Sequence, residues 1–471
     1  MRIGSKHLGV KVVQYVDFTG GLNFSVPPDA LALNEAQMLL NWEYDFSSGV
    51  LKTRDGLKKL GSLTNNIDQL YYAKNLGVLL VSAGGKVYKY NNDGTFTELG
   101  VLSGSEVPVF AEWSDKVLIA SGNKLQSTDG STLTTIDTSP LCDYVNVQYG
   151  RVIVSKQGDD YLYWSGIGDE TNWNFSGTDS DALQLEVGYK DGGNIVAVKM
   201  LAKDIIVFKD NKRIYRIVGV YPDWVVYNIS KDNGALSRFS AIEIGNSLAF
   251  IDKNGIKSLD TVLEYGDIKV RDAGEKINIY LAKNLNPAQV RLWHIRPKGQ
   301  IWIKGQNDNF IYVFHYFNKA WTMFQFRESV TAVAYDDKAI YVALGTNLYQ
   351  MDGTIFTDDG QEIQARIITK KIHSNKNFLL KRGKIFYRGL KQGTVNLKIN
   401  KLYKQIDLSQ SGDIAYLDTD IAYSDDDPVV QPESSLQEFR CNHRLSYLQP
   451  EIVITSGALK FYGLILEVVE V

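Results

Sequence analysis

The 471-residue chain is poor in cysteine and proline and has no long apolar run, and each shortage narrows the class of protein it can be. Its two cysteines, Cys142 and Cys441, are too few for a disulfide framework or a cysteine metal site. We expect two free, buried thiols in a reducing cytoplasm. No apolar run approaches the roughly 18 residues of a membrane span, and the first residues lack the apolar core of a signal peptide. The sequence therefore predicts a chain that is synthesised in the cytoplasm and does not insert into a membrane.

The chain also lacks the motifs of the common enzyme classes. GxxxxGK[ST], HExxH and CxxC do not occur, and the GGK at 84–86 is followed by valine, which is typical of a turn between strands. The five histidines are dispersed, and His294 and His315 lie in aromatic stretches where packing is expected rather than metal binding. The NDG at 92–94 lacks the glutamate that closes a calcium loop, so it predicts a hairpin turn. We expect no catalysis, no metal and no cofactor.

What the chain does contain is tyrosine and glycine, 27 and 40 residues respectively, a composition that fits strands joined by tight turns. A short apolar strand, a turn and a second strand rich in Tyr, Val and Ile recur seven times between residues 61 and 357. The second strands and turns are KVYKYNNDGTF (86–96), KLQSTDGSTL (124–133), YLYWSGIGDETNW (161–173), RIYRIVGVYPDWVVY (213–227), GIKSLDTVLEYGDIKV (255–270), FIYVFHYFNKAWTMF (310–324) and NLYQMDGTIF (347–356). A spacing of about 36 to 50 residues predicts a β-propeller of about seven blades, with six to eight possible.

The repeats divide the all-β chain into three expected segments. Residues 1–60 form an N-terminal segment with a short helix over 34–44, because Asn34 can cap it and Met38, Leu39 and Trp42 form an apolar stripe. Residues 61–357 form the propeller, and 358–471 form a sandwich-like C-terminal β platform.

Further elements are expected within these segments. A second helix is predicted over 272–290 at the outside or rim of the ring, because apolar residues recur there every four positions. In the platform, strands are expected at 362–372, 384–390, 394–403, 451–455 and 459–470.

The platform has the sharpest charge asymmetry in the chain. Residues 366–404 include twelve Lys or Arg and no Asp or Glu, whereas 405–438 include nine acids and no base, by count along the printed sequence. The two stretches either cancel within one domain, or the basic one meets phosphates, or the two meet across a subunit interface. The candidate basic residues are Lys370, Lys371, Lys376, Lys381, Arg382, Lys384 and Arg388, and the candidate acidic residues are Asp425, Asp426 and Asp427.

Some β-propeller proteins bind or cleave carbohydrate, and this is the alternative hypothesis for the function of the chain. Cleavage needs two carboxylates that face a cleft, and the candidates are Asp159, Asp160, Asp169 and Glu170. All four lie in predicted turns, where acids mostly serve the turn itself. A propeller-type interaction scaffold of the WD40 class is a third option, and the missing GH…WD signature counts against it.

Four stretches together resemble the tail hub or nozzle proteins of short-tailed bacteriophages, also called packaged-DNA stabilisation proteins. They are GGLN…NEAQMLLNWEYDFSSGVLKTRDGLKKL near the N-terminus, YLYWSGIGDETNWN at 161–174, RIYRIVGVYPDWVVYNISKDNGALSRFSAIEIGNSLAFIDKNGIKSL at 213–259, and GEKINIYLAKNLNPAQVRLWHIRPKGQIWIKG…FIYVFHYFNKAWTMF. The closing LKFYGLILEVVEV is also similar, so the likeness covers most of the chain in order.

The resemblance implies a structural virion protein of the tail, made in the host cytoplasm. It implies a homo-oligomeric ring, a hexamer, that extends the DNA channel below the portal and adaptor proteins. Such a ring would retain packaged DNA until ejection, let double-stranded DNA pass through its lumen, and dock tail fibres or spikes. The alternative implies a receptor-binding tail component that binds or cleaves glycans.

Overall fold

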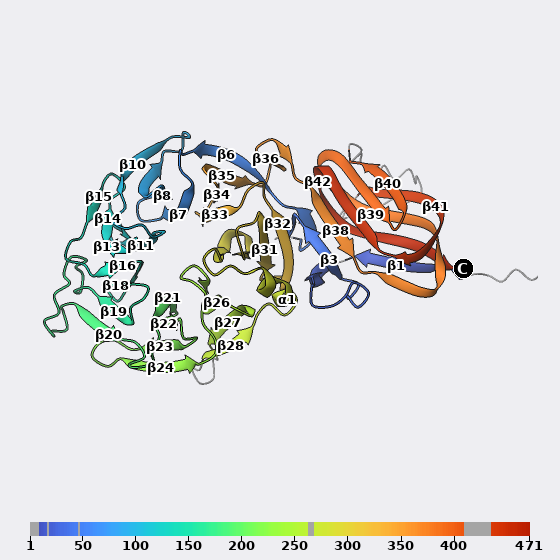
Figure 1. Cartoon of the computed structure of the whole chain (residues 1–471). Helices are drawn as coiled ribbons and strands as arrows, with labels where there is room; N and C mark the ends of the chain where they lie inside the picture. The colour runs from blue at the N-terminus through green and yellow to red at the C-terminus, as the bar shows by residue number, and fades with distance from the viewer. Residues whose placement is uncertain (1–8, 17, 46–47, 262–267, 409–434) are drawn as a thin grey trace, which may run out of the picture. The chain divides into compact units, whose positions relative to one another are not determined.

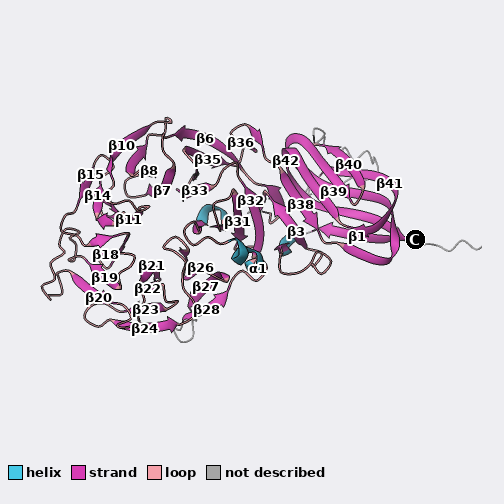
Figure 2. Cartoon of the chain, viewed as in Figure 1, coloured by secondary structure: helices cyan, strands magenta, loops and turns pink. Residues whose placement is uncertain are grey.

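The computed structural model describes residues 9–16, 18–45, 48–261, 268–408 and 435–471. Strands and the turns between them make up nearly all of it, which confirms the all-β prediction (Figure 2). The chain divides into two compact units. The propeller unit comprises Lys58–Ile311 and Phe326–Met351, and the half-barrel unit comprises Met1–Leu57, Tyr312–Gln325 and Asp352–Val471. These units differ from the three consecutive segments expected from the sequence, because three separate pieces of chain build the half-barrel unit.

The propeller unit contains five separate four-stranded antiparallel sheets and a sixth set of four paired strands within a larger sheet, which together form a six-blade arrangement and confirm the predicted fold. Five of them are built from strands that follow one another along the chain, and the sixth takes its fourth strand, β6, from the N-terminal side. The sheets are β7 (Ile67–Ala73), β8 (Val78–Ala83), β9 (Lys86–Tyr90), β10 (Phe96–Val101); β11 (Val109–Trp113), β12 (Lys116–Ala120), β14 (Gln126–Thr128), β15 (Leu133–Thr135); β17 (Tyr144–Gln148), β18 (Arg151–Ser155), β19 (Tyr161–Trp164), β20 (Leu183–Glu186); β21 (Ile195–Leu201), β22 (Asp204–Lys209), β23 (Ile214–Val218), β24 (Val225–Ser230); β25 (Ala241–Ile244), β26 (Ser247–Asp252), β27 (Gly255–Thr261), β28 (Ile268–Asp272); and β33 (Val330–Tyr335), β34 (Ile340–Leu344), β35 (Asn347–Asp352), β6 (Gly56–Ser62). Strands β29 (Arg291–Ile295) and β30 (Gln300–Lys304) form an antiparallel pair between the fifth and sixth sheets in sequence, and β31 (Phe310–His315) pairs with β30 in the same sheet.

First strands such as β7, β11, β21 and β33 lie toward the centre of this unit, and fourth strands such as β24 and β28 lie at its periphery (Figure 1). Second strands are buried on both faces, as in β12 and β22, because each sheet is covered by its neighbours. Hydrophobic clusters accordingly cross from one sheet to the next, as where Phe208 of β22 lies 5.1 Å from Phe250 of β26 between ring centroids. This explains why the first strand of each sequence repeat, which becomes the second strand of a sheet, is often apolar without alternation.

The helix predicted over 272–290 is much shorter than expected. It consists of α1 (Asn278–Leu281) and a 3-10 turn over Ala282–Asn284. Ile277 and Leu281 are fully buried, so the apolar spacing correctly indicated residues that pack in the core. The rest of the segment forms turns. Among the residues that the structure describes, no helix is long and apolar enough to cross a membrane.

The half-barrel unit is organised around two very long antiparallel strands, β39 (Ile372–Ile399) and β42 (Pro450–Glu470). Gly393 and Gly457 lie where both strands bend, since a Cβ at Gly393 would approach the Ser456 carbonyl oxygen to 2.1 Å and Gly457 has a φ of +84°. Bulges around this bend let the pair continue as one curved ladder. The other strands of the unit are β1 (Lys11–Val16), β2 (Gly21–Leu22), β3 (Glu35–Leu40), β4 (Trp42–Tyr44), β5 (Leu51–Thr53), β32 (Ala320–Gln325), β36 (Thr357–Asp358), β37 (Gln361–Glu362), β38 (Ala365–Thr369), β40 (Leu402–Asp407) and β41 (Ser435–Leu448).

This half-barrel sheet carries one large hydrophobic core, to which Trp42, Tyr387 and Leu466 belong. The expected strands at 384–390 and 394–403 are mostly parts of β39, which stays paired with β42 on both sides of the bend. The sandwich-like platform of the sequence prediction is therefore a single folded-over sheet.

The helix predicted over 34–44 is wrong. Residues Glu35–Leu40 form strand β3, which pairs with β38 on one side and with β2 and β32 on the other. Asn41 has a φ of 59°, which ends β3 before β4 begins. The apolar spacing that suggested a helix instead serves two short strands, in which Leu39 and Trp42 are both fully buried. Pairing with distant strands has overridden the local pattern.

Candidate functional site

The predicted basic residues lie on or next to β39, but two of them serve the half-barrel unit itself. The Lys370 ammonium donates a hydrogen bond to the Leu31 carbonyl oxygen. The Lys371 ammonium lies 4.3 Å from the centroid of the Tyr447 ring, a cation–π distance. Both lysines are half-buried. They are therefore poor candidates for contact with DNA or with another subunit.

Three of the remaining predicted cations are more accessible. Lys376, Lys381 and Arg388 are exposed, whereas Arg382 and Lys384 are half-buried. Arg382 Nε lies 2.8 Å from Glu438 Oε1 of β41 and 3.8 Å from Glu467 Oε2 of β42.

Glutamates within the same unit pair with several cations of the basic run. Glu451 lies 2.6 Å from Arg366 and 3.7 Å from Lys398, nitrogen to oxygen. Lys391 pairs with Glu362 at 2.5 Å. Apart from Glu438, none of these carboxylates belongs to the acidic stretch 405–438. Opposite charges therefore do cancel across strands, but most of the acidic partners are glutamates that the sequence analysis did not identify.

The acidic residues Asp425, Asp426 and Asp427 lie outside the described residues. A contact of the basic run with DNA or with a neighbouring subunit therefore stays a prediction.

A shallow pocket of about 440 Å³ lies over this face, lined by Lys381, Arg382, Arg440, Cys441, Asn442 and Glu467. Arg382 and Arg440 are directly opposite each other on β39 and β41. Like charges in that position repel, and the Arg382 pair with Glu438 offsets the repulsion. The pocket is a cationic surface feature that the sequence predicted only in part, because Arg440 comes from a strand that was not expected.

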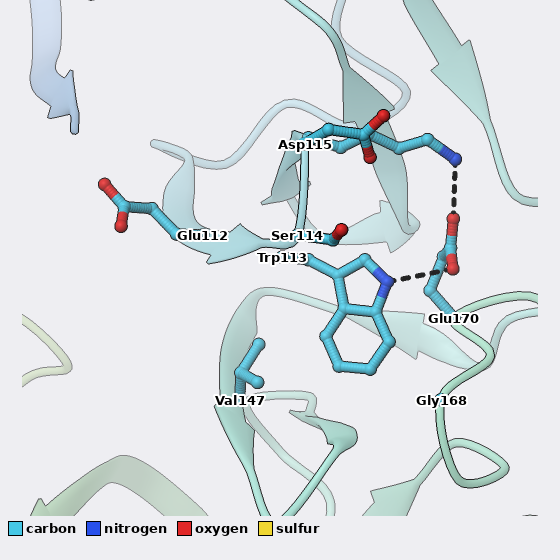
Figure 3. A pocket seen from close by; sticks show the side chains of 8 residues that line it. Glu112, Trp113, Ser114, Asp115, Val147, Gly168 and Glu170 are labelled. Carbon is cyan, nitrogen blue, oxygen red and sulfur yellow. Dashed lines mark hydrogen bonds and ion pairs between the residues drawn. The ribbon is translucent and has the colours of Figure 1, made fainter. Parts of the chain in front are cut away.

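Of the four candidate carboxylates for glycan cleavage, Glu170 lines a second pocket, of about 510 Å³, in the propeller unit (Figure 3). Glu170 accepts hydrogen bonds from Trp113 Nε1 at 2.9 Å and from Lys116 Nζ at 2.8 Å. Burial alone would raise the pKa of the Glu170 carboxyl, but these hydrogen bonds outweigh it and hold the pKa below its usual range. Glu112 points away from this pair in Figure 3. Glu170 is therefore held as an ionised, structurally engaged carboxylate.

The neighbouring acids serve turns, as the sequence predicted. Asp169 accepts hydrogen bonds from the backbone and hydroxyl of Thr171, which lower the pKa of its carboxyl. Asp159 accepts hydrogen bonds from the backbone of Asp160 and from the hydroxyl of Tyr163. A glycosidase needs one carboxyl that stays protonated as a general acid. The pKa values of the Asp169 and Glu170 carboxyls are lowered, which favours the ionised form instead.

The other candidate ligands are packed or scattered. His315 is buried and lies 2.9 Å from the Thr322 hydroxyl, ring nitrogen to oxygen, while burial lowers the pKa of the half-buried His294. Cys142 is buried and Cys441 half-buried, and both thiols are free, so full burial holds for Cys142 alone. Over the described ranges, no group of three His, Cys, Asp or Glu is placed to hold a metal ion.

No protein-family model and no curated protein matches the sequence. Among solved structures, the chain is similar to BamB from Moraxella catarrhalis, at 8% identity over 64% of this chain and 90% of that one, with a TM-score of 0.41. It is similar to the N-terminal domain of Nup159 at 9% identity over 66% and 98% of the two chains, with a TM-score of 0.43. For the extracellular domain of BT4673 from B. thetaiotaomicron, identity is 10%, coverage 89% and 63%, and the TM-score 0.45. Likeness at this level carries no argument about function.

Proposed function

We propose that this chain is a structural virion protein, the subunit of a ring of about six copies that forms the tail nozzle or hub of a short-tailed bacteriophage. In that role the ring extends the DNA channel below the portal and adaptor proteins, retains packaged DNA until ejection and docks tail fibres or spikes. The sequence resemblance is the source of this proposal.

The observation that best supports the proposal is how the half-barrel unit is tied together. Three separate pieces of chain share one sheet and one core, so the unit cannot open without separating strands that are distant in sequence. A ring that holds pressurised DNA needs subunits that resist such opening. The exposed cations Lys376, Lys381 and Arg388 supply a surface for a neighbouring subunit or for sparse contact with DNA.

The direct test is negative-stain imaging of the purified full chain, alone and mixed with portal and adaptor proteins. Rings with a central hole wide enough for a DNA duplex would support the proposal. Particles that remain single subunits beside those proteins would overturn it.

A charge-reversal variant tests which surface makes the ring contact. Lys376→Glu combined with Lys381→Glu and Arg388→Glu should weaken ring assembly, because these side chains are exposed. Lys58→Glu combined with Lys59→Glu and Lys253→Glu, three exposed lysines of the propeller unit, is the matched control for added negative charge. If assembly is unchanged by the first variant and by high salt, where exposed charges are screened, a charge-driven interface is wrong.

The second candidate, a glycan-cleaving propeller, is not favoured by any observation on its carboxylates. Hydrogen bonds lower the pKa of the Asp169 and Glu170 carboxyls, so neither of the two suits the role of general acid. Binding of carbohydrate without cleavage is a separate question, which concerns another part of the propeller unit.

A further inference from the structure

The centre of the propeller unit is closed at one end. Arg238 lies in the segment ahead of β25, and its guanidinium pairs with Glu106 at 3.0 Å and with Asp143 at 3.1 Å, from the segments ahead of β11 and β17. Arg291, the first residue of β29, donates hydrogen bonds to the carbonyl oxygens of Asp68 in β7 and Thr331 in β33, at 2.9 and 2.7 Å. These contacts span the channel where the inner strands begin.

The Phe239 ring completes this closure. The guanidinium carbons of Arg238 and Arg291 lie 5.0 and 4.7 Å from its centroid. The Phe239 carbonyl oxygen accepts a hydrogen bond from the Leu292 backbone. Two cations and an aromatic ring thus hold the segment before β25 across the channel. These contacts define the closed end of what we call the cup.

The opposite end of the channel is open and forms a cavity of about 940 Å³. Its walls carry Tyr71 and Tyr72 of β7, Trp293 and His294 of β29, and Tyr335 of β33. Cavities of about 300–1,000 Å³ accommodate small organic ligands. Aromatic rings that carry a polar tip offer a flat apolar surface together with hydrogen-bonding groups.

Charges of both signs stand at the rim of this cup. Lys74 Nζ lies 3.4 Å from Asp337 Oδ1, and the Lys74 backbone donates a hydrogen bond of 2.5 Å to Glu112. Arg296 also lines the cavity. Two acids beside two bases leave no net field for an ionic ligand, and a purely apolar ligand would bury these charges without partners.

The wall groups are uncharged near neutral pH. Burial raises the pKa of Tyr71, with the nearby Glu112 adding to the shift, and burial raises the pKa of Tyr335 as well. Burial lowers the pKa of His294, which favours the neutral imidazole. These groups can therefore both donate and accept hydrogen bonds.

We propose that this cup, formed by the aromatic walls Tyr71, Tyr72, Trp293 and Tyr335 and the mixed-charge rim, is a binding site for a neutral saccharide of two to three sugar units. The apolar face of a sugar ring stacks on the half-buried Tyr335 ring. The other aromatic rings shape the wall, since Tyr71 and Tyr72 are stacked on Phe110 and Tyr341 and Trp293 is 9% exposed. The ring hydroxyls bind the rim charges, which can donate and accept at once. The proposal is independent of ring assembly and involves no cleavage.

The test is calorimetric titration of the full chain with three neutral trisaccharides, maltotriose, cellotriose and mannotriose, and with the anionic sialyllactose. We expect at least one neutral trisaccharide to bind, with sialyllactose weaker. Tyr335→Ala should weaken that binding roughly tenfold or more, as for the loss of one stacking contact.

Asp337→Asn guards against a folding defect in the Tyr335 variant, because the Asp337 side chain is 91% exposed; it should weaken binding several-fold without loss of stability. Tyr403→Ala, a change at a 60% exposed tyrosine of the half-barrel unit, is the matched control and should leave binding unchanged. The proposal is wrong if no neutral trisaccharide binds, if sialyllactose binds more tightly, or if binding survives both cup variants.

Discussion

In the propeller unit most strands pair with the strand that precedes or follows them in sequence, as β21 to β24 do. In the half-barrel unit the partners are far apart, and the Lys460 ammonium pairs with Asp45 at 2.9 Å although 415 residues separate them. The first arrangement repeats one hairpin unit around a ring. The second needs the N-terminal segment, the 312–325 segment and the C-terminal strands to be present together.

This difference has a cost in chain entropy. Closing a long loop costs more than closing a short one, and structures rich in distant contacts fold more slowly. We therefore expect the half-barrel unit to form after the propeller sheets and to respond as one cooperative block. The chain has one cysteine in each unit, Cys142 in the propeller unit and Cys441 in the half-barrel unit, so thiol labelling during urea unfolding reports on the two units separately.

The largest expected effect is at Arg54, which ties the N-terminal segment to β36. Its guanidinium is 1% exposed and bonds Asp358 through two nitrogens, with a further hydrogen bond to the Gln325 carbonyl oxygen. Arg54→Ala leaves a buried carboxylate uncompensated, which should lower the free energy of unfolding of the half-barrel unit by about 3–5 kcal/mol.

Urea unfolding with Cys441 labelling measures this loss. The matched control is Arg366→Ala, whose pair with Glu451 is 41% exposed at the arginine and should cost less than about 1 kcal/mol. Equal losses in the two variants would mean that Arg54 does not hold the unit together.

Trp321 gives a nearly equal effect through packing instead of charge. The side chain is 3% exposed and its ring lies 4.7 Å from Phe314, centroid to centroid. Trp321→Ala should cost about 3–5 kcal/mol through the cavity it leaves.

Phe208→Ala in the propeller unit should cost a similar amount, because Phe208 is fully buried against Phe250. The two variants should differ in which cysteine becomes labelled first. Trp321→Ala should expose Cys441 at lower urea and leave Cys142 protected, and Phe208→Ala should do the reverse. Joint exposure in both variants would mean that the units unfold as one.

Stability of the propeller unit should depend on pH through Lys304. Burial lowers the pKa of this ammonium to about 8, and the positive charge of Arg291 adds to the effect while Asp308 opposes it. Between about pH 8 and the usual lysine pKa the unfolded chain binds more protons than the folded one, so stability should rise with pH there.

The expected gain is on the order of 1–3 kcal/mol, measured by urea unfolding with Cys142 labelling at pH 7.5 and 10. Lys304→Met should remove it, and Lys338→Met, at an exposed turn of the same unit, should not. A gain of the same size in both variants would assign the pH dependence to other groups.

The smallest expected effect is a difference in reactivity between the two thiols of the native protein, which involves no change in stability. Burial raises the pKa of both thiols, but Cys142 is fully buried whereas Cys441 is half-buried and so more accessible to a reagent. In the native protein Cys441 should react with a thiol reagent roughly a hundredfold faster than Cys142. Comparable rates would mean that the propeller unit opens locally around Cys142.

The same contrast explains what the sequence could predict. The propeller was visible because each sheet is a local strand–turn–strand unit, so its signal stays within a short window. The helix expected over 34–44 was wrong because β3 is a strand only through its pairing with β38 and β32. The basic run was found, but its partner Glu451 lies on β42, whose pairing with β39 no local pattern reveals.

The cup could not be found from the sequence for a related reason. Tyr71, Trp293 and Tyr335 lie on strands far apart along the chain, and only closure of the ring brings them around one cavity. An aromatic residue on an inner strand has the same local pattern whether it faces the core or the channel.

The measurement that most directly tests the central claim is the mass of the purified full-length chain by light scattering, alone and with portal and adaptor proteins, at low and high salt. The account predicts a discrete assembly of about six copies, at least in the presence of those proteins. A single-copy mass under all these conditions would contradict the assignment as a ring-forming nozzle subunit.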